Sequence, residues 1–290
     1  MNLKKLYSMI EVIKSGLYTS IQDKGRFGFE NYGVPISGSM DQFSSLLANK
    51  LLNNNENDAV MEITMTGPVL KFHKMTKISI TGADISPSLN NYPIKLNTSH
   101  SINKDDILSF GKLKYGLRCY LSVSGGFLTK KVLNSRSMYP NITKSFRIAK
   151  GEHLKINSIK YLKTRLSMSK IDYLDHFKSN EINVYKGPEF DKLSQKQNLD
   201  IFNKNFSISN NNNRMAFQLN ESVENQLKPI ITSLVMQGTV QLTPSGNILI
   251  LMRDNQTCGG YPRILQLNEN SINKLSQKYM NNKIRFKLVE

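Results

Sequence analysis

Cysteine is nearly absent from this 290-residue sequence, which contains only Cys119 and Cys258. Neither lies in a Cys-X-X-Cys pair, so the sequence indicates neither a disulfide framework nor a zinc site. The histidines are dispersed without the spacing of metal ligands, and we expect no metal. They are His73, His100, His153 and His176.

The sequence also contains no apolar run long enough to span a bilayer. The N-terminal stretch 1–13 is interrupted by Glu11 and lacks a cleavage site of small residues, so it does not resemble a signal peptide. We therefore expect a soluble, cytoplasmic protein without a membrane partner.

Several common catalytic motifs have no counterpart in the sequence. The Walker phosphate loop, the Rossmann glycine fingerprint, the His-Glu-X-X-His zinc pair and the Gly-X-Ser-X-Gly elbow do not occur. These absences argue against the enzyme classes that those motifs define.

Positive charge is in excess, with 39 Lys and Arg against 22 Asp and Glu, a formal net charge of +17. The lysines are scattered, and no basic cluster with interleaved aromatics or docking motif indicates a nucleic-acid partner. A solvated basic surface and attraction to an anionic ligand or acidic partner both remain open.

Short alternating or β-branched runs bounded by Gly, Pro, Asn or Asp predict a mainly β fold of barrels or packed sandwiches. The predicted strands are Val60–Met65, Lys77–Thr81, Tyr92–Leu96, Ile107–Phe110, Arg118–Val123, Glu181–Tyr185, Leu234–Leu242, Asn247–Met252, Arg263–Leu267 and Lys283–Val289.

Two helices are predicted from apolar residues at helical spacing. The first is Asp41–Leu52, capped by Ser39 or Asp41, and the second is Asn270–Tyr279, capped by Asn270 or Ser271. Residues 157–180 are polar and Lys-rich, so we place a boundary there between two β subdomains, 1–165 and 166–290.

Polar residues and glycines are dense in a first segment, Gly16–Asp41. Asp23 and Arg26 on its glycine-marked turn suit an ion pair or substrate binding, and Ser37-Gly38-Ser39 offers backbone N–H groups to an anion. The same residues also suit a capped helix with an ion pair inside the loop, and composition does not separate the two interpretations.

A second polar segment, Pro244–Arg263, gathers an acid, amides, a hydroxyl, an aromatic ring and arginines after one strand. Such polar density rarely serves packing. Between the two segments, Asp84 ends a strand and Arg136 lies among serines, a setting suited to binding carboxylate or phosphate. Arg214 adds another cation.

Taken in order, several motifs resemble the family of the 5-oxoprolinase C subunit, within the group of biotin-dependent carboxyltransferases and allophanate hydrolase subunit 2. The resemblance runs over almost the whole chain. The motifs are Gly16–Arg26, Gly33-Val34-Pro35 with Ser37–Asp41, Thr81–Asp84, Ser135–Ser137, and Gln256-Thr257 with Gly259–Arg263.

This resemblance implies a cyclophilin-like β-barrel architecture and two 5-oxoprolinase partners, one of the B type and a separate one of the A type. It also implies a cytoplasmic enzyme, inactive as this chain alone, that uses ATP to open the lactam of 5-oxoproline to L-glutamate, ADP and phosphate. ATP is the implied cofactor, with Mg²⁺ compatible with it.

Side-chain chemistry and motif position suggest roles for the site residues. Three aspartates suit acid, base or cation-orienting roles: Asp23, Asp84 and Asp254. The remaining residues suit binding or positioning of substrate or ATP: Gln22, Arg26, Ser37, Ser39, Arg136, Arg214, Gln256, Thr257, Tyr261 and Arg263.

Two other functions stay open. One is carboxyl transfer, in which the chain acts on urea or another small amide with carboxybiotin, although this sequence has no Met-Lys-Met biotin acceptor. The other is a regulatory binding module without catalysis. If the subdomains pack as the resemblance implies, Asp23 and Arg26 should face the same cleft as Asp254–Arg263.

Overall fold

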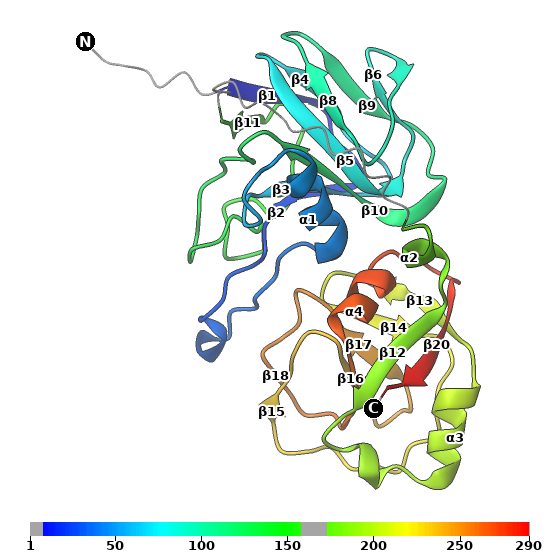
Figure 1. The fold of residues 1–290 in the computed structure, drawn as a ribbon. Coiled ribbons are helices and arrows are strands. Elements are labelled where there is room, and N and C mark those ends of the chain that lie inside the picture. The colour runs from blue at the N-terminus through cyan, green and yellow to red at the C-terminus, as the bar shows by residue number, and fades with distance from the viewer. Residues whose placement is uncertain (1–7, 158–172, 290) are drawn as a thin grey trace. The chain divides into compact units, whose positions relative to one another are not determined.

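The computed structural model describes residues 8–157 and 173–289, and its contacts divide them into two compact units (Figure 1). The first unit contains residues 8–25 and 41–157, and the second contains 26–40 and 173–289. The chain therefore enters the second unit at Arg26 and returns to the first at Asp41. The boundary predicted at 165/166 lies outside the described residues.

The first unit is built from two β-sheets whose shared core contains Ile10, Leu70, Ile80 and Leu121. The six-stranded sheet consists, in spatial order, of β11 (His153–Ile156), β1 (Ser8–Lys14), β4 (Val69–Phe72), β9 (Ile107–Phe110), β6 (Pro87–Leu89) and β7 (Tyr92–Pro93). The five-stranded sheet consists of β2 (Tyr18–Gln22), β3 (Val60–Thr64), β10 (Tyr115–Val123), β5 (Thr76–Asp84) and β8 (Ser99–Ile102).

Helix α1 (Gln42–Leu51) packs on the five-stranded sheet against β5 and β10. Asp41 caps it by accepting a 3.0 Å bond from the Ser44 N–H, which confirms one of the two predicted caps. The Asp41 N–H donates to the Tyr120 hydroxyl at 2.8 Å, and that hydroxyl donates to Glu62 at 2.9 Å. Burial raises the pKa of the Tyr120 phenol, so this link remains protonated and fixes the start of the helix.

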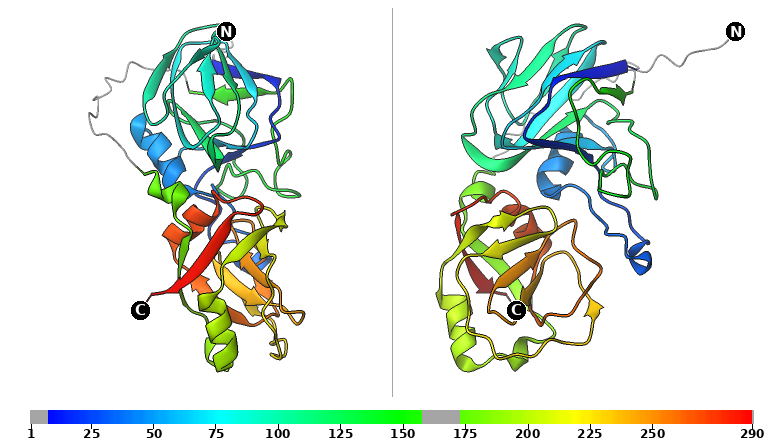
Figure 2. Two further views of the ribbon diagram at one scale, coloured as in Figure 1. Left: turned by 90° about the vertical axis from the view of Figure 1, so that its right-hand side faces the viewer. Right: turned by 180° about the vertical axis from the view of Figure 1, so that it is seen from behind.

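The second unit is a closed seven-stranded barrel (Figure 2). Strands β12 and β20 pair in parallel, and the other neighbours pair antiparallel, so no barrel edge is left unpaired. Fully buried apolar side chains such as Phe217, Ile250 and Leu265 fill it. Its strands in order are β12 (Glu181–Lys186), β19 (Arg263–Leu267), β16 (Thr239–Leu242), β17 (Ile248–Leu251), β14 (Ala216–Leu219), β13 (Phe206–Asn212) and β20 (Lys283–Leu288).

This architecture confirms the predicted mainly β fold with a barrel and a few short helices. The strand predicted at 234–242 is wrong as one element, because Gly238 turns the chain with a φ of +83° between β15 and β16. Helix α4 (Glu269–Leu275) is capped by Asn268, so both caps predicted for it were wrong.

Helix α3 (Gln195–Asn203), which packs beside β20, was not predicted; a capping box between Ser194 and Gln197 starts it. The remaining short elements are α2 (Asp175–Lys178), β15 (Ser233–Leu234), β18 (Cys258–Gly259), and the single turns η1 (Glu30–Tyr32) and η2 (Phe190–Lys192). Within the part of the chain that the structure describes, no helix is long and apolar enough to cross a membrane.

Candidate functional site

Ser37, Arg214 and Asp254 form a buried polar cluster in the second unit. Arg214 shortly precedes β14 and Asp254 follows β17, and these strands pair so that the Asp254 N–H donates to the Arg214 carbonyl at 2.9 Å. The guanidinium donates to both carboxylate oxygens of Asp254, from Nε at 2.8 Å and from Nη2 at 3.0 Å. This two-pronged geometry is the strong form of an Arg–carboxylate bond.

Ser37 completes this cluster by donating its hydroxyl to the Asp254 carboxylate at 2.6 Å. Its backbone has a φ of +61°, a conformation that is uncommon for residues other than glycine. The Ser37 N–H donates to the Arg253 carbonyl at 3.1 Å, so it is not available to an anion as the sequence predicted. Strain retained at a buried hydroxyl is typical of a functional position.

Arg253 is a buried cation of the second unit that the sequence prediction did not select. Its guanidinium donates to Gln237 at 2.7 Å, to Asn273 at 3.0 Å and to both carboxylate oxygens of Glu269. Its Nε also donates to the Met40 carbonyl at 3.3 Å. It therefore ties the end of the crossing segment 26–40 to the barrel. The signal for it in the sequence was its place in the polar segment Pro244–Arg263.

Arg263 was predicted to bind phosphate or carboxylate, and within the chain it already binds a carboxylate. Nε and Nη2 each donate to Glu189 at 3.0 Å, and Nη1 donates to the Leu234 carbonyl at 2.9 Å. The hydrogen bonds from Arg263 lower the pKa of Glu189 and raise that of Arg263 itself. Glu189 was absent from the predicted site because it lies 74 residues away.

Buried polar atoms mark two more predicted residues of the second unit. Among the described residues, neither the Ser39 hydroxyl nor the Gln256 carbonyl oxygen has a hydrogen-bond partner. Arg26 is buried, and its backbone N–H donates to the Ile36 carbonyl. Thr257 accepts from the Val235 N–H through its backbone carbonyl, and Tyr261 is 39% exposed. The unpartnered oxygens of Ser39 and Gln256 are groups that a bound polar molecule can satisfy.

Asp23, in the first unit, is held by a different set of donors. Its carboxylate accepts from the hydroxyls of Ser135 at 2.6 Å and Ser137 at 2.7 Å and from the backbone N–H groups of Arg136 at 2.6 Å and Gly25 at 2.9 Å. These bonds fix the loop that carries Arg136, whose guanidinium donates to the carbonyl of Thr129. Asp23 thus organises a loop in the first unit.

Gln22 lies beside Asp23 at the end of β2. Its amide nitrogen donates to the Ser20 hydroxyl at 3.0 Å and to the Met138 carbonyl at 3.2 Å. Its carbonyl oxygen is buried without a partner among the described residues.

Asp84 does not join the group around Asp23. Gln22 pairs with Val60 at one end of the five-stranded sheet, and Asp84 pairs with Tyr115 at the other end. Its carboxylate accepts from the Ser86 N–H at 2.8 Å and lies 3.2 Å from the Lys114 ammonium. Asp84 is therefore a turn residue at a sheet end, apart from Asp23.

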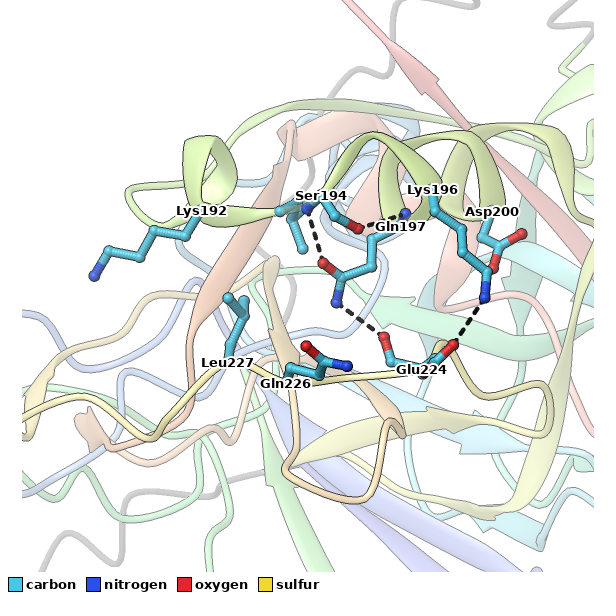
Figure 3. Close-up of a pocket in the computed structure, with 9 residues that line it drawn as sticks. Lys192, Ser194, Lys196, Gln197, Asp200, Glu224, Gln226 and Leu227 are labelled. Atoms are coloured by element: carbon cyan, nitrogen blue, oxygen red, sulfur yellow. Dashed lines mark hydrogen bonds and ion pairs between the residues drawn. The ribbon is translucent and has the colours of Figure 1, made fainter.

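A cavity of about 400 Å³ lies elsewhere in the second unit, between the start of α3 and residues 224–227 (Figure 3). Several of its polar groups bond one another: Ser194 and Gln197 bond each other, Gln197 donates to the Glu224 carbonyl, and Lys196 pairs with the Glu224 carboxylate. No predicted site residue lines it, so we do not assign it to the candidate site.

Known proteins similar to this chain fall into two groups. It is 27% identical to the C subunit of 5-oxoprolinase from Haemophilus influenzae, over 97% of this chain and 91% of that one. The Escherichia coli protein of the same name is 26% identical over 96% and 90%. Urea amidolyase of Lachancea kluyveri is 42% identical over 44% of this chain, but over only 7% of its own length.

Solved structures confirm the fold. Kluyveromyces lactis urea amidolyase matches 98% of this chain with a TM-score of 0.87 and 27% identity, and this chain spans 19% of that protein. The structure named TTHA0988 matches 99% of this chain with a TM-score of 0.87 at 21% identity, and this chain spans 57% of its length.

The family model described as "Carboxyltransferase domain, subdomain A and B" matches residues 32–288. That range covers most of both units, and the relatives extend the similarity over nearly the full chain. The chain therefore belongs to the carboxyltransferase family with subdomains A and B.

Proposed function

We propose that this chain is one of the subunits of an ATP-dependent 5-oxoprolinase. The observation that carries the proposal is the similarity to the 5-oxoprolinase C subunit, which extends over 97% of this chain and 91% of the relative. The urea amidolyases match over 7% and 12% of their own lengths. The word "subunit" in the relatives' name supports an assembly of several chains, and we propose partners of the B and A types.

In the proposed reaction, ATP phosphorylates the lactam oxygen of 5-oxoproline and ADP leaves. Water then adds to the ring carbon, the carbon–nitrogen bond breaks with the nitrogen leaving as an amine, and a second water releases phosphate. The products are L-glutamate, ADP and phosphate. Donors fixed in advance stabilise the charge that develops on oxygen.

The cluster of Ser37, Arg214 and Asp254 supports this chemistry because its donors are buried and held in place. Asp254 orients both the Ser37 hydroxyl and the guanidinium, and the Arg214 Nη2 also donates to the Gly38 carbonyl at 2.6 Å. In our proposal, Ser37 and Arg214 contact the lactam or its carboxylate, and Ser39 and Gln256 position it. ATP is proposed as a substrate of the assembled enzyme.

A second candidate, carboxyl transfer from carboxybiotin to urea or a similar amide, is favoured by the 42% identity to Lachancea kluyveri urea amidolyase. The matched segment is 130 residues long, and a donor of carboxybiotin would have to come from outside the 290 residues of this sequence.

Reconstitution with the two partner proteins distinguishes the candidates. We expect ADP release that depends on 5-oxoproline and yields L-glutamate, without any requirement for biotin. An assembled complex that releases no ADP with 5-oxoproline, but consumes carboxybiotin with urea, would replace the first candidate with the second. Co-elution of all the component chains is the control for assembly.

A further inference from the structure

Two histidines and a glutamate gather on the outward face of the six-stranded sheet. Glu11 on β1 pairs directly with His153 on β11, so both side chains project from the same face. His73 follows β4 on the other side of β1, and its backbone N–H donates to the Met9 carbonyl at 3.1 Å. Three neighbouring segments therefore contribute one side chain each.

The potential ligand atoms of these three residues all lie within 4.8 Å of one another. The Nε2 atom of His73 is 2.9 Å from a carboxylate oxygen of Glu11, and the rings of His73 and His153 are stacked with centroids 6.1 Å apart. Ligand atoms around a tetrahedral Zn²⁺ lie roughly 3.4 Å apart, from metal–ligand distances of about 2.0–2.1 Å. The three atoms therefore lie close to the spacing that one such ion requires.

The donor set is chemically selective. Two imidazoles and one carboxylate suit zinc and other divalent first-row transition metals, whereas Mg²⁺ and Ca²⁺ prefer oxygen ligands alone. Glu11 and His73 are each 35% exposed at the side chain and His153 is exposed, so an ion can enter from solvent.

The surrounding positive charge disfavours nonspecific binding of a cation at this face. The formal net charge is +17, and Lys71 on β4 is the cross-strand neighbour of Glu11 on β1. The Lys71 ammonium lies 3.2 Å from Asp105. Binding of a divalent ion here therefore has to come from direct coordination.

We propose that Glu11, His73 and His153 bind one divalent transition metal, with Zn²⁺ as the best fit, and that the ion clasps β1, β4 and β11 together. Three protein ligands leave a fourth position for water. The sequence predicted no metal, because 62 residues separate Glu11 from His73 and strand pairing alone brings the ligands together.

Titration calorimetry of the full chain with Zn²⁺ tests the proposal, in a Cys258→Ser background that removes the exposed thiol. We expect one ion per chain. His73→Ala, His153→Ala and Glu11→Gln should each weaken binding at least about tenfold, since even the loss of supporting residues around a metal costs 10–100-fold. Zn²⁺ should raise the unfolding temperature of the parent but not of these variants.

His100→Ala is the matched control, because His100 lies on β8 of the other sheet and contacts the Lys95 carbonyl at 2.7 Å. It should bind Zn²⁺ like the parent. The proposal is wrong if no stoichiometric binding occurs, if His153→Ala binds as the parent does, or if His100→Ala loses binding equally. The first outcome would leave Glu11 and His73 as a simple hydrogen-bonded pair.

Discussion

Asp23 and Asp254 were both predicted to be catalytic acids, but their carboxylates accept hydrogen bonds from different kinds of donor. Asp23, in the first unit, accepts four hydrogen bonds from uncharged hydroxyl and backbone donors. Asp254, in the second unit, is gripped by the Arg214 guanidinium and by the Ser37 hydroxyl. The first arrangement holds a loop in shape, whereas the second fixes a charge and a hydroxyl together. In our proposal, the second arrangement therefore belongs to the substrate site, with Asp254 as a positioning residue.

The largest expected effect on stability comes from removing the Arg214 guanidinium that binds Asp254. Arg214→Ala leaves the buried Asp254 carboxylate unpaired, and breaking a buried pair in this way costs about 3–5 kcal/mol of unfolding free energy. Chemical denaturation measures the loss. Arg214→Lys keeps the charge and should lose less; a loss below about 1 kcal/mol in the alanine variant would contradict the role of this pair.

Asp23 is tested by removing its carboxylate. Asp23→Ala leaves the Ser135 and Ser137 hydroxyls and the Arg136 N–H without their acceptor, which should cost about 2 kcal/mol. Asp23→Asn keeps one acceptor oxygen and should cost less. Hydrogen exchange at the Arg136 amide provides the local measurement, and unchanged protection in Asp23→Ala would show that the loop holds its shape without Asp23.

Glu189 and Arg263 supply a second carboxylate–guanidinium pair, with a pH dependence. The pKa of Glu189 lies below its ordinary 4.5 because Arg263 hydrogen-bonds the carboxylate. A folded-state pKa below the unfolded one means that the stabilisation is complete above about pH 4.5 and is lost as pH falls through the folded-state value. Glu189→Gln should cost about 1–2 kcal/mol at about pH 7.

The difference between wild type and Glu189→Gln should therefore shrink steadily as acid is added below pH 4.5. Denaturation curves of both proteins across that range measure it. A difference that stays constant into strong acid would show that the glutamate acts through packing instead of charge.

The smallest effect is expected at the exposed pair of Lys196 and Glu224, 2.8 Å apart beside the cavity of Figure 3. Both groups are solvated, so Lys196→Ala should leave the unfolding midpoint unchanged. A clear shift in that midpoint would mean that surface pairs in this chain contribute as buried pairs do.

Local patterns predicted part of the local structure. The strands Ile107–Phe110 and Arg263–Leu267 and the Asp41 cap were found as predicted, because alternation and capping depend on neighbouring residues. Helix α3 was missed because its sequence is polar, although the capping box of Ser194 and Gln197 is a local signal for its start. The crossing of segment 26–40 into the second unit has no local signal.

The candidate site was predictable in composition but not in pairing. The two polar segments do meet, at Ser37 and Asp254 in the second unit, while Asp23 belongs to the first unit, so its place in a shared cleft stays a prediction. Glu189 was not foreseen, since its contact with Arg263 depends on long-range strand order. The same holds for His73 and His153, which only the sheet brings together.

The most direct test of the catalytic assignment is turnover by Ser37→Ala in the reconstituted complex, measured as 5-oxoproline-dependent ADP release. The Ser37 hydroxyl donates to Asp254, so its loss disturbs the preorganised cluster and should lower kcat roughly 100-fold or more. Assembly should be unchanged, the cost in unfolding free energy should stay within about 1–3 kcal/mol, and Ser245→Ala, in an exposed turn, should be as active as wild type. Wild-type turnover by an assembled Ser37→Ala complex would contradict the assignment of the site to the second unit.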